Sequence, residues 1–218
     1  TEGTHELLSE LTIRGEANEI YFNKTAGKIK LLANVTDTST LYSQGIPGIN
    51  NLSGQLSYAE QNLHLKLVAT QGALDFNQHF IAPIPYQSLS ATVDLSFVDQ
   101  DWKLAVNDIA LSSSELKLTA DLAIESLKNT NTNMSLLASI TDVDVSKIGH
   151  YYPLTSMSSN LVGYLNNALI DGKVTQAQVL FNGPLAKFPF NDNAGVFIVD
   201  AELEDATFEF DDEWPSIT

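Results

Sequence analysis

The sequence contains no cysteine among its 218 residues. This excludes a disulfide framework, a zinc-thiolate site and thiol catalysis. Because disulfides are rare in the cytosol but not obligatory outside it, the absence of cysteine is compatible with either the cytosol or the periplasm. The absence of cysteine therefore excludes thiol chemistry but does not indicate in which compartment the protein works.

Basic residues are scarce as well. Lys and Arg number 11 against 27 Asp and Glu, which gives a formal net charge of −16 at pH 7. Nucleic-acid binding rests on Lys and Arg that neutralise phosphates, and the same cations attract proteins to anionic membrane surfaces. The composition therefore argues against nucleic acid as a partner and against docking of this chain on an anionic membrane.

Long apolar runs and the sequence motifs of catalysis are also missing. No stretch approaches the roughly 20 apolar residues that span a bilayer, and no signal peptide precedes Thr1. We expect the chain to be a fragment of a longer protein, with any membrane anchor or export signal outside it. Because no P-loop, dinucleotide fingerprint or nucleophile elbow occurs, the sequence predicts neither an enzyme nor a cofactor.

Residues that could ligate a metal are scattered. His5, His64, His79 and His150 have no ligand spacing, and the alternation of its strand places His64 on the polar side. The segment 191–195 has the composition of a calcium loop, but Asn, Asp and Gly also favour the tight turn expected there. We therefore predict no metal site.

Acidic residues gather towards the end of the chain, whereas aromatic residues are spread along it. Acidic side chains are rarely buried, so a solvated face is their expected role. The aromatic residues Trp102, Tyr151, Tyr152 and Trp214 could form a carbohydrate or peptide platform, although such residues more often serve as core. The acidic group comprises Glu202, Glu204, Asp205, Glu209, Asp211, Asp212 and Glu213, of which Glu202, Glu204 and Glu209 are expected on the polar side of their strands.

The feature that the sequence does show is alternation. From Leu52 onward, apolar residues occupy every second position in short segments separated by turn-forming residues. This pattern is typical of antiparallel strands with one dry face and one wet face. A shift of parity near Asn107 and Asp108 predicts a bulge. The pattern is weaker upstream, where we predict strands over 7–13 and 29–35 joined by a polar connection, then a loop or short helix over 37–51.

One substantial helix is predicted over about 155–169. Thr155 and Ser156 are candidate N-caps, and apolar residues then recur at offsets of three and four. Asp171 and Gly172 are expected to end the helix, because glycine adopts the left-handed conformation of a C-terminal cap. We therefore expect one mainly β region over 1–218, with first strands and a loop at 1–51, a meander at 52–145, a helical section at 146–172 and closing strands at 173–218.

The dry face of such a sheet must be covered. A helix of about 15 residues is roughly 22 Å long at 1.5 Å per residue, too short to roof eight or more strands. A second sheet, closure into a barrel, or an apolar ligand along a curved sheet could provide the cover. From patterning alone, a sandwich is favoured, and it would suit a non-enzymatic scaffold, adhesion or glycan-binding module.

An ordered series of short motifs runs through the last third of the chain. It comprises Tyr151-Tyr152-Pro153-Leu154, Tyr164-Leu165 with Ala168-Leu169, Gly172, Gly183-Pro184-Leu185, Phe188-Pro189-Phe190, Gly195-Val196-Phe197 and Trp214-Pro215. The series resembles the YhdP proteins, which belong to the AsmA-like group of large bacterial envelope proteins. The family tends to have Leu and Trp where this chain has Tyr152 and Tyr164, and both replacements keep a bulky apolar body.

The resemblance implies a curved antiparallel sheet, or gutter, of repeated meanders that holds phospholipid acyl chains between the inner and outer membranes. It further implies a periplasmic location, neighbouring repeats of the same chain as partners, and a full-length protein anchored in the inner membrane outside this fragment. The residues implied to line the gutter are Leu63, Leu65, Leu67, Val93, Leu95, Leu116, Leu118, Leu122, Met134, Leu136, Phe197 and Val199.

Overall fold

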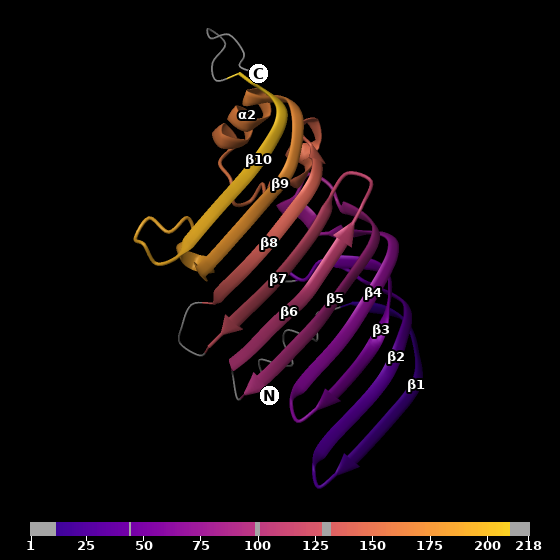
Figure 1. Cartoon of the computed structure of the whole chain (residues 1–218). Helices are drawn as coiled ribbons and strands as arrows, with labels where there is room; N and C mark the ends of the chain where they lie inside the picture. The colour runs from indigo at the N-terminus through magenta and orange to yellow at the C-terminus, as the bar shows by residue number, and fades with distance from the viewer. Residues whose placement is uncertain (1–11, 44, 99–100, 128–131, 210–218) are drawn as a thin grey trace.

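Ten antiparallel strands form a single sheet in which every strand pairs with its neighbours in sequence (Figure 1). The computed structural model describes residues 12–43, 45–98, 101–127 and 132–209. The strands are β1 (Ile13–Thr25), β2 (Lys28–Thr40), β3 (Gly48–Ala59), β4 (Asn62–Asp75), β5 (Ile84–Val98), β6 (Asp101–Ser112), β7 (Lys117–Ser126), β8 (Asn133–Asp144), β9 (Leu169–Pro184) and β10 (Val196–Phe208). The connections hold the 3₁₀ helices η1 (Asn77–His79), η2 (Val145–Tyr151) and η3 (Leu185–Lys187) and the helix α2 (Ser159–Ala168).

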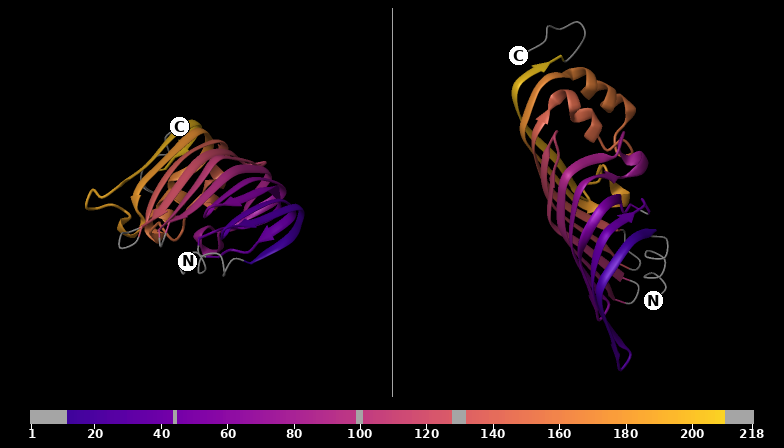
Figure 2. Two further views of the ribbon diagram at one scale, coloured as in Figure 1. Left: turned by 90° about the horizontal axis from the view of Figure 1, so that it is seen from below. Right: turned by 90° about the vertical axis from the view of Figure 1, so that its right-hand side faces the viewer.

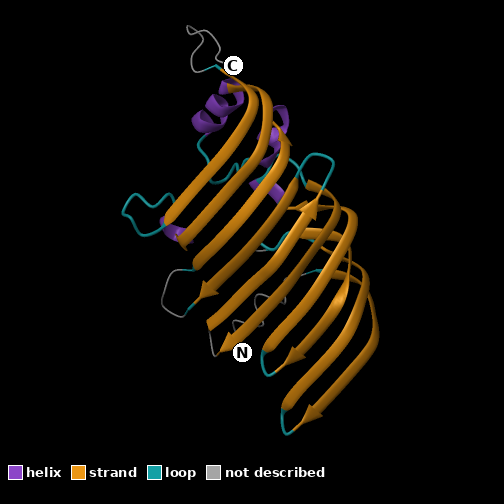
Figure 3. Ribbon diagram, viewed as in Figure 1, coloured by secondary structure: helices purple, strands orange, loops and turns teal. Residues whose placement is uncertain are grey.

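The sheet is curved and open. Figure 2 shows long strands that bend in the same sense, and the two helices near the C-terminal end lie on the concave side. The predicted mainly β, antiparallel, curved sheet is therefore confirmed. The sandwich that patterning alone favours is not formed, because all ten strands of the described residues belong to one sheet (Figure 3).

Strand register assigns each residue to one of the two faces, because directly paired residues of antiparallel strands point to the same side. One row of partners crosses from β3 to β10 and is apolar throughout. It comprises Leu56, Leu65, Val93, Val106, Leu122, Leu136, Phe181 and Phe197. The row that contains Leu52, Ala69, Leu89, Leu111, Leu118, Ile140 and Ala177 lies on the same side. We call this side the inner face.

The opposite, outer face carries charged and polar side chains together with exposed apolar residues such as Leu137 and Ile198. The row that follows His64 contains Asp94, Ala105, Ala123 and Ser135. Between neighbouring strands, a hydrogen bond joins His64 to Asp94 at 2.7 Å and an ion pair joins Lys103 to Glu125 at 2.9 Å. Their side chains are about half exposed, and exposed pairs of this kind contribute little stability. They mark the side of the sheet that water wets.

The predicted helix exists, but it is shorter than expected at both ends. It starts at Ser159 because the Ser158 side chain accepts a hydrogen bond from the Leu161 backbone at 3.2 Å, whereas Ser156 lies in a turn closed by its N–H to the Pro153 carbonyl. The prediction that Asp171 and Gly172 end it is wrong. The helix passes directly into β9 at Leu169, and Gly172 lies inside that strand.

Upstream of Leu52 the predicted boundaries are only partly right. The polar connection predicted between the first two strands is mostly strand, since β1 runs over Ile13–Thr25 and is exposed along its whole length. An edge strand with no buried face shows no alternation, so its sequence resembles a loop. Residues 7–11 lie outside the described residues. The bulge predicted near Asn107 and Asp108 is confirmed by a register shift between Val106 and Ile109.

Candidate functional site

The inner face is the candidate site, and its central rows carry no charged side chain. Register places eleven of the twelve residues expected to line a gutter on this one face, in four rows headed by Leu63, Leu65, Leu67 and Leu118. The twelfth, Leu116, directly precedes β7 and is buried against the core cluster beside the sheet. These eleven residues therefore lie on one continuous surface.

These residues differ in how well the rest of the chain covers them. Leu67, Leu95 and Leu116 are buried, with exposures of 7%, 7% and 4%. Phe197 and Val199 on β10 are 46% and 56% exposed. Leu63, Leu65, Val93, Leu118, Leu122, Met134 and Leu136 are half-buried. Much of the apolar surface thus stays in contact with solvent, which is uncommon for a face of this extent.

One end of the inner face is covered by residues 145–168, which we call the strap. Val145 of η2 is buried in one cluster with Leu111, Leu116, Val143 and Val174. Ile148 and Tyr151 pack against the same cluster. The strap therefore lies on the inner side of the sheet, across the ends of the strands from β6 to β9.

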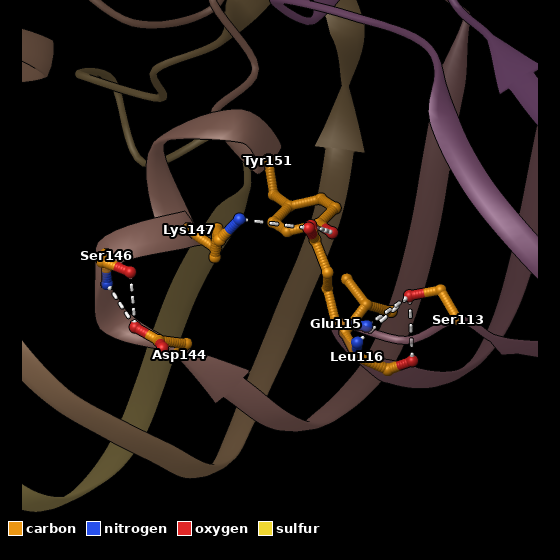
Figure 4. A network of polar contacts seen from close by, with 7 residues as sticks. All are labelled: Ser113, Glu115, Leu116, Asp144, Ser146, Lys147 and Tyr151. Atoms are coloured by element: carbon orange, nitrogen blue, oxygen red, sulfur yellow. Dashed lines mark hydrogen bonds and ion pairs between the residues drawn. The ribbon is translucent and has the colours of Figure 1, made fainter.

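A polar contact fastens the strap to the turn between β6 and β7. The Tyr151 hydroxyl donates to the Glu115 carboxylate at 2.9 Å, and Lys147 Nζ lies 3.4 Å from the same carboxylate (Figure 4). The Tyr151 hydrogen bond is the largest influence that lowers the pKa of Glu115. Burial, followed by the same hydrogen bond, raises the pKa of Tyr151. The pair therefore favours a charged carboxylate and a neutral phenol.

The far side of the strap reaches the connection between β4 and β5. His79 Nδ1 lies 2.6 Å from Thr155 Oγ1, and its Nε2 lies 3.0 Å from the Tyr42 hydroxyl. The Leu154 backbone N–H donates to the His79 carbonyl at 2.8 Å. Strand-end connections far apart in the sequence are thus joined at this end, and His79 serves as a structural link.

Aromatic residues cover the opposite end of β9 and β10. The Phe181 ring packs against Phe188, Phe190 and Phe197, with centroid distances of 5.8, 5.1 and 6.2 Å. A Cβ at Gly183 would meet the Phe190 ring at 2.9 Å, so the glycine lets the ring lie against the backbone. The two aromatic residues around Pro189 thus anchor the connection to the inner face.

Trp102 and Tyr151, two of the aromatic residues considered as a binding platform, lie far apart in the structure. Trp102 lies at the start of β6, beside Phe97 and Ser126, whereas Tyr151 contacts Glu115 beyond the other end of that strand. They therefore form no common aromatic platform. Trp214, His5 and residues 211–213 lie outside the described residues. Among the residues that the structure describes, no three potential metal ligands lie together.

The acidic and Asx-rich segments mostly match their expected roles. Glu202 pairs with Gln176 on the outer face, and Asp192 closes a turn by accepting a hydrogen bond from the Ala194 backbone at 3.1 Å. Glu209 differs from the expectation of a strand's solvated side. It follows the end of β10, donates its backbone N–H to the Ala168 carbonyl at 3.0 Å, and lines a cleft beside α2.

Sequence reasoning missed part of the inner face. The pairing adds residues from strands whose alternation is interrupted or weak: Phe22, Leu31, Ala33, Val106 and Phe181. Register shifts in β1 and β2 break the parity on which the sequence pattern depends. If the alternation is followed separately on each side of a bulge, Leu31 and Val106 are assigned to the inner face.

An open antiparallel sheet with a long, uncharged apolar face defines a protein that offers an extended apolar surface. The chain belongs to the YhdP protein family, whose sequence model matches residues 1–218. It is 26% identical over 195 residues to the intermembrane phospholipid transporter YhdP of Escherichia coli strain K12. The aligned region covers 89% of this chain and 15% of that protein, so the chain spans a small part of its relative's length.

Two further findings complete the comparison. No solved structure matches the chain at a significant level. Among the described residues, neither α2 nor any shorter helix has the length and apolar character that a membrane-crossing helix needs.

Proposed function

We propose that this chain holds phospholipid acyl chains against its inner face and forms one segment of a longer protein that moves lipid between two membranes. The observation that supports this most strongly is the row from Leu56 to Phe197, which crosses eight strands without a polar side chain. Family membership and the name of the Escherichia coli relative agree with it.

The mechanism is passive. An acyl chain in water costs about 0.8 kcal/mol per CH₂ relative to an apolar environment, so an apolar gutter lowers the barrier to carrying lipid across an aqueous space. No covalent step or cofactor is required, and we therefore propose a carrier and not an enzyme. The matching compartment is the periplasm, and any inner-membrane anchor belongs to parts of the protein outside this chain.

The two edges of the sheet support a longer assembly. Within the described part of the chain, β1 and β10 are the outermost strands of the sheet, each paired with one neighbouring strand, and both are exposed at almost every position. Exposed edge strands of this length pair readily with further strands. Phe22 and Val199, 60% and 56% exposed, place apolar side chains on the inner face at both edges. We propose that neighbouring repeats of the same protein extend the sheet, and the apolar face, on both sides.

Site-specific photocrosslinking in cells tests the proposal. Benzoylphenylalanine in place of Leu65 or Leu122 faces the inner side, whereas the same residue in place of Lys66 or Asp121 faces the outer side of the same strands. We expect phospholipid adducts, detected by mass spectrometry, only from the two inner positions. Equal labelling from both faces, or no lipid adduct at either inner position, contradicts the proposal.

A further inference from the structure

We infer that a cleft at the strap end of the gutter binds the ammonium headgroup of an aminophospholipid, of the phosphoethanolamine type. The inference rests on the proposed function and names the class of lipid that suits it. The cleft has a volume of about 980 Å³ and lies between η2, α2, the start of β9 and the residue after β10. This volume is within the range of small-molecule sites.

The polar side of the cleft favours a cation. It presents the Glu209 carboxylate and the amides of Asn166 and Asn167, and none of these side chains has a hydrogen-bond partner among the described residues. Carboxylate and amide oxygens are acceptors for an ammonium group. The lysines on the flanking segments are engaged elsewhere, since Lys147 pairs with Glu115 and Lys173 pairs with Asp142. The unpaired charge in the cleft is therefore negative.

The phosphate of a zwitterionic headgroup also has hydrogen-bond donors available in the cleft. The amide groups of the two asparagines and a ring N–H of His150 can donate to a phosphate oxygen. An anionic headgroup such as phosphoglycerol offers no cation to Glu209 and brings its own negative charge towards it. A chain with a net charge of −16 repels that headgroup further.

The apolar side of the cleft borders the core cluster of the inner face. Val145, Ile148 and Leu169 line the cleft and also pack in or against the core cluster of that face. One layer of side chains thus separates the polar groups of the cleft from the apolar gutter. The cleft thus places a headgroup beside the end of the gutter along which its acyl chains would lie.

Gly149 keeps the cleft open. A Cβ at this position would lie 2.9 Å from Asn166 Oδ1 and 4.0 Å from Tyr152 Cε2. The hydroxyl next to that ring carbon is the one buried side-chain polar atom without a hydrogen-bond partner in the described part of the chain. Alanine at 149 needs no unusual backbone conformation, so it displaces the Asn166 amide at little cost to folding.

Headgroups without acyl chains test the inference directly. We would titrate the ¹⁵N-labelled full chain with glycerophosphoethanolamine and with glycerophosphoglycerol and follow the Asn166 and Asn167 side-chain amides. The ethanolamine probe should bind more tightly by up to about fivefold, as expected for one partly exposed ion pair. Glu209→Gln should remove that preference. Gly149→Ala should abolish binding, and Gly163→Ala, a helix position with no atom within 4 Å of the added Cβ, should not.

Two outcomes overturn the inference: equal affinity for both headgroups, or equal binding by the Gly149→Ala and Gly163→Ala variants. Unchanged amide spectra away from the cleft show that each variant is folded. The photocrosslinking experiment separates failure of the cleft from failure of the proposed function. Lipid adducts at Leu65 without headgroup selectivity retain the gutter and reject the cleft, whereas headgroup binding without adducts rejects the gutter.

Discussion

Tyr151 and Glu115 are separated by 36 residues and joined by a hydrogen bond of 2.9 Å that fastens the strap to the turn after β6. Tyr151→Phe keeps the ring packed on the core cluster and removes only the hydroxyl. We expect a loss of about 1 kcal/mol in the free energy of unfolding, the usual net value of such a bond, measured by urea denaturation. Tyr21→Phe, whose residue is 55% exposed, is the matched control and should have no measurable effect.

The same pair predicts how stability depends on pH. The hydrogen bond from Tyr151 lowers the pKa of Glu115, so its contribution is present above the unfolded value of about 4.5 and is lost as pH falls through the lower folded value. The pKa of Tyr151 is raised by burial, so its contribution is complete below about 10 and declines at higher pH. Unfolding curves of Tyr151→Phe should therefore approach those of the unmodified chain at both extremes. A constant difference from pH 3 to pH 11 contradicts this assignment.

Ser158 should control the stability of α2. Its side chain accepts the Leu161 N–H at 3.2 Å, and loss of an N-cap costs about 1 kcal/mol. Ser158→Ala should therefore raise amide exchange rates in the first turn of α2 about fivefold by hydrogen exchange. Ser159→Ala removes a hydroxyl one residue later, at a position that does not cap, and should leave exchange almost unchanged. Equal effects of the two variants would show that Ser158 is not the cap.

Gly72 has no side chain, and the Tyr86 ring occupies the space that a side chain would fill. These residues pair across β4 and β5, and a Cβ at Gly72 would lie 2.5 Å from the Tyr86 hydroxyl oxygen and 2.7 Å from Cζ. Tyr86 is only 3% exposed and cannot move away freely. Gly72→Ala should therefore destabilise the chain by about 1–3 kcal/mol, as overpacking does. Gly163→Ala, in open space on α2, serves as the control in thermal unfolding and should be neutral or stabilising.

A charge on the inner face should block lipid without disrupting the outer face. Leu118→Asp and Leu65→Asp place an unpaired carboxylate in apolar rows, where its desolvation is costly. We expect at least a tenfold loss of co-purified phospholipid, measured by mass spectrometry on soluble protein. Thr119→Asp, on the outer face of β7, should retain the lipid. Retention of lipid by Leu118→Asp and Leu65→Asp would contradict the proposed path.

The central strands could be predicted from the sequence because burial of one face imposes alternation. Leu116, Leu118, Ala120 and Leu122 alternate cleanly because β7 lies between two paired neighbours and one side faces the core. β1 has no such constraint. Ile20, Tyr21 and Phe22 occur consecutively, and each is at least 55% exposed. Apolar residues therefore lie on both faces of β1, and the sequence pattern does not indicate which face is the inner one.

Local signals also failed where tertiary contacts decide the boundary. Gly172 resembles a helix cap in sequence, but a Cβ there would lie 2.7 Å from Ala206 Cα, so the residue allows β10 to approach β9. The position of the strap on the inner face depends on pairs such as Glu115 and Tyr151, and the spacing of residues in one sequence does not reveal them. The cleft was missed for the same reason, since Glu209 and Asn166 meet only through the return of β10 to α2.

The unbroken order from β1 to β10 has a consequence for how the chain acquires its shape. Each strand hydrogen-bonds only with the strand made immediately before it or after it. Structures in which each unit contacts only its neighbours are stabilised by nearest-neighbour interactions. Hairpins can therefore add one at a time as the polypeptide emerges, and an interrupted chain yields a shorter version of the same architecture.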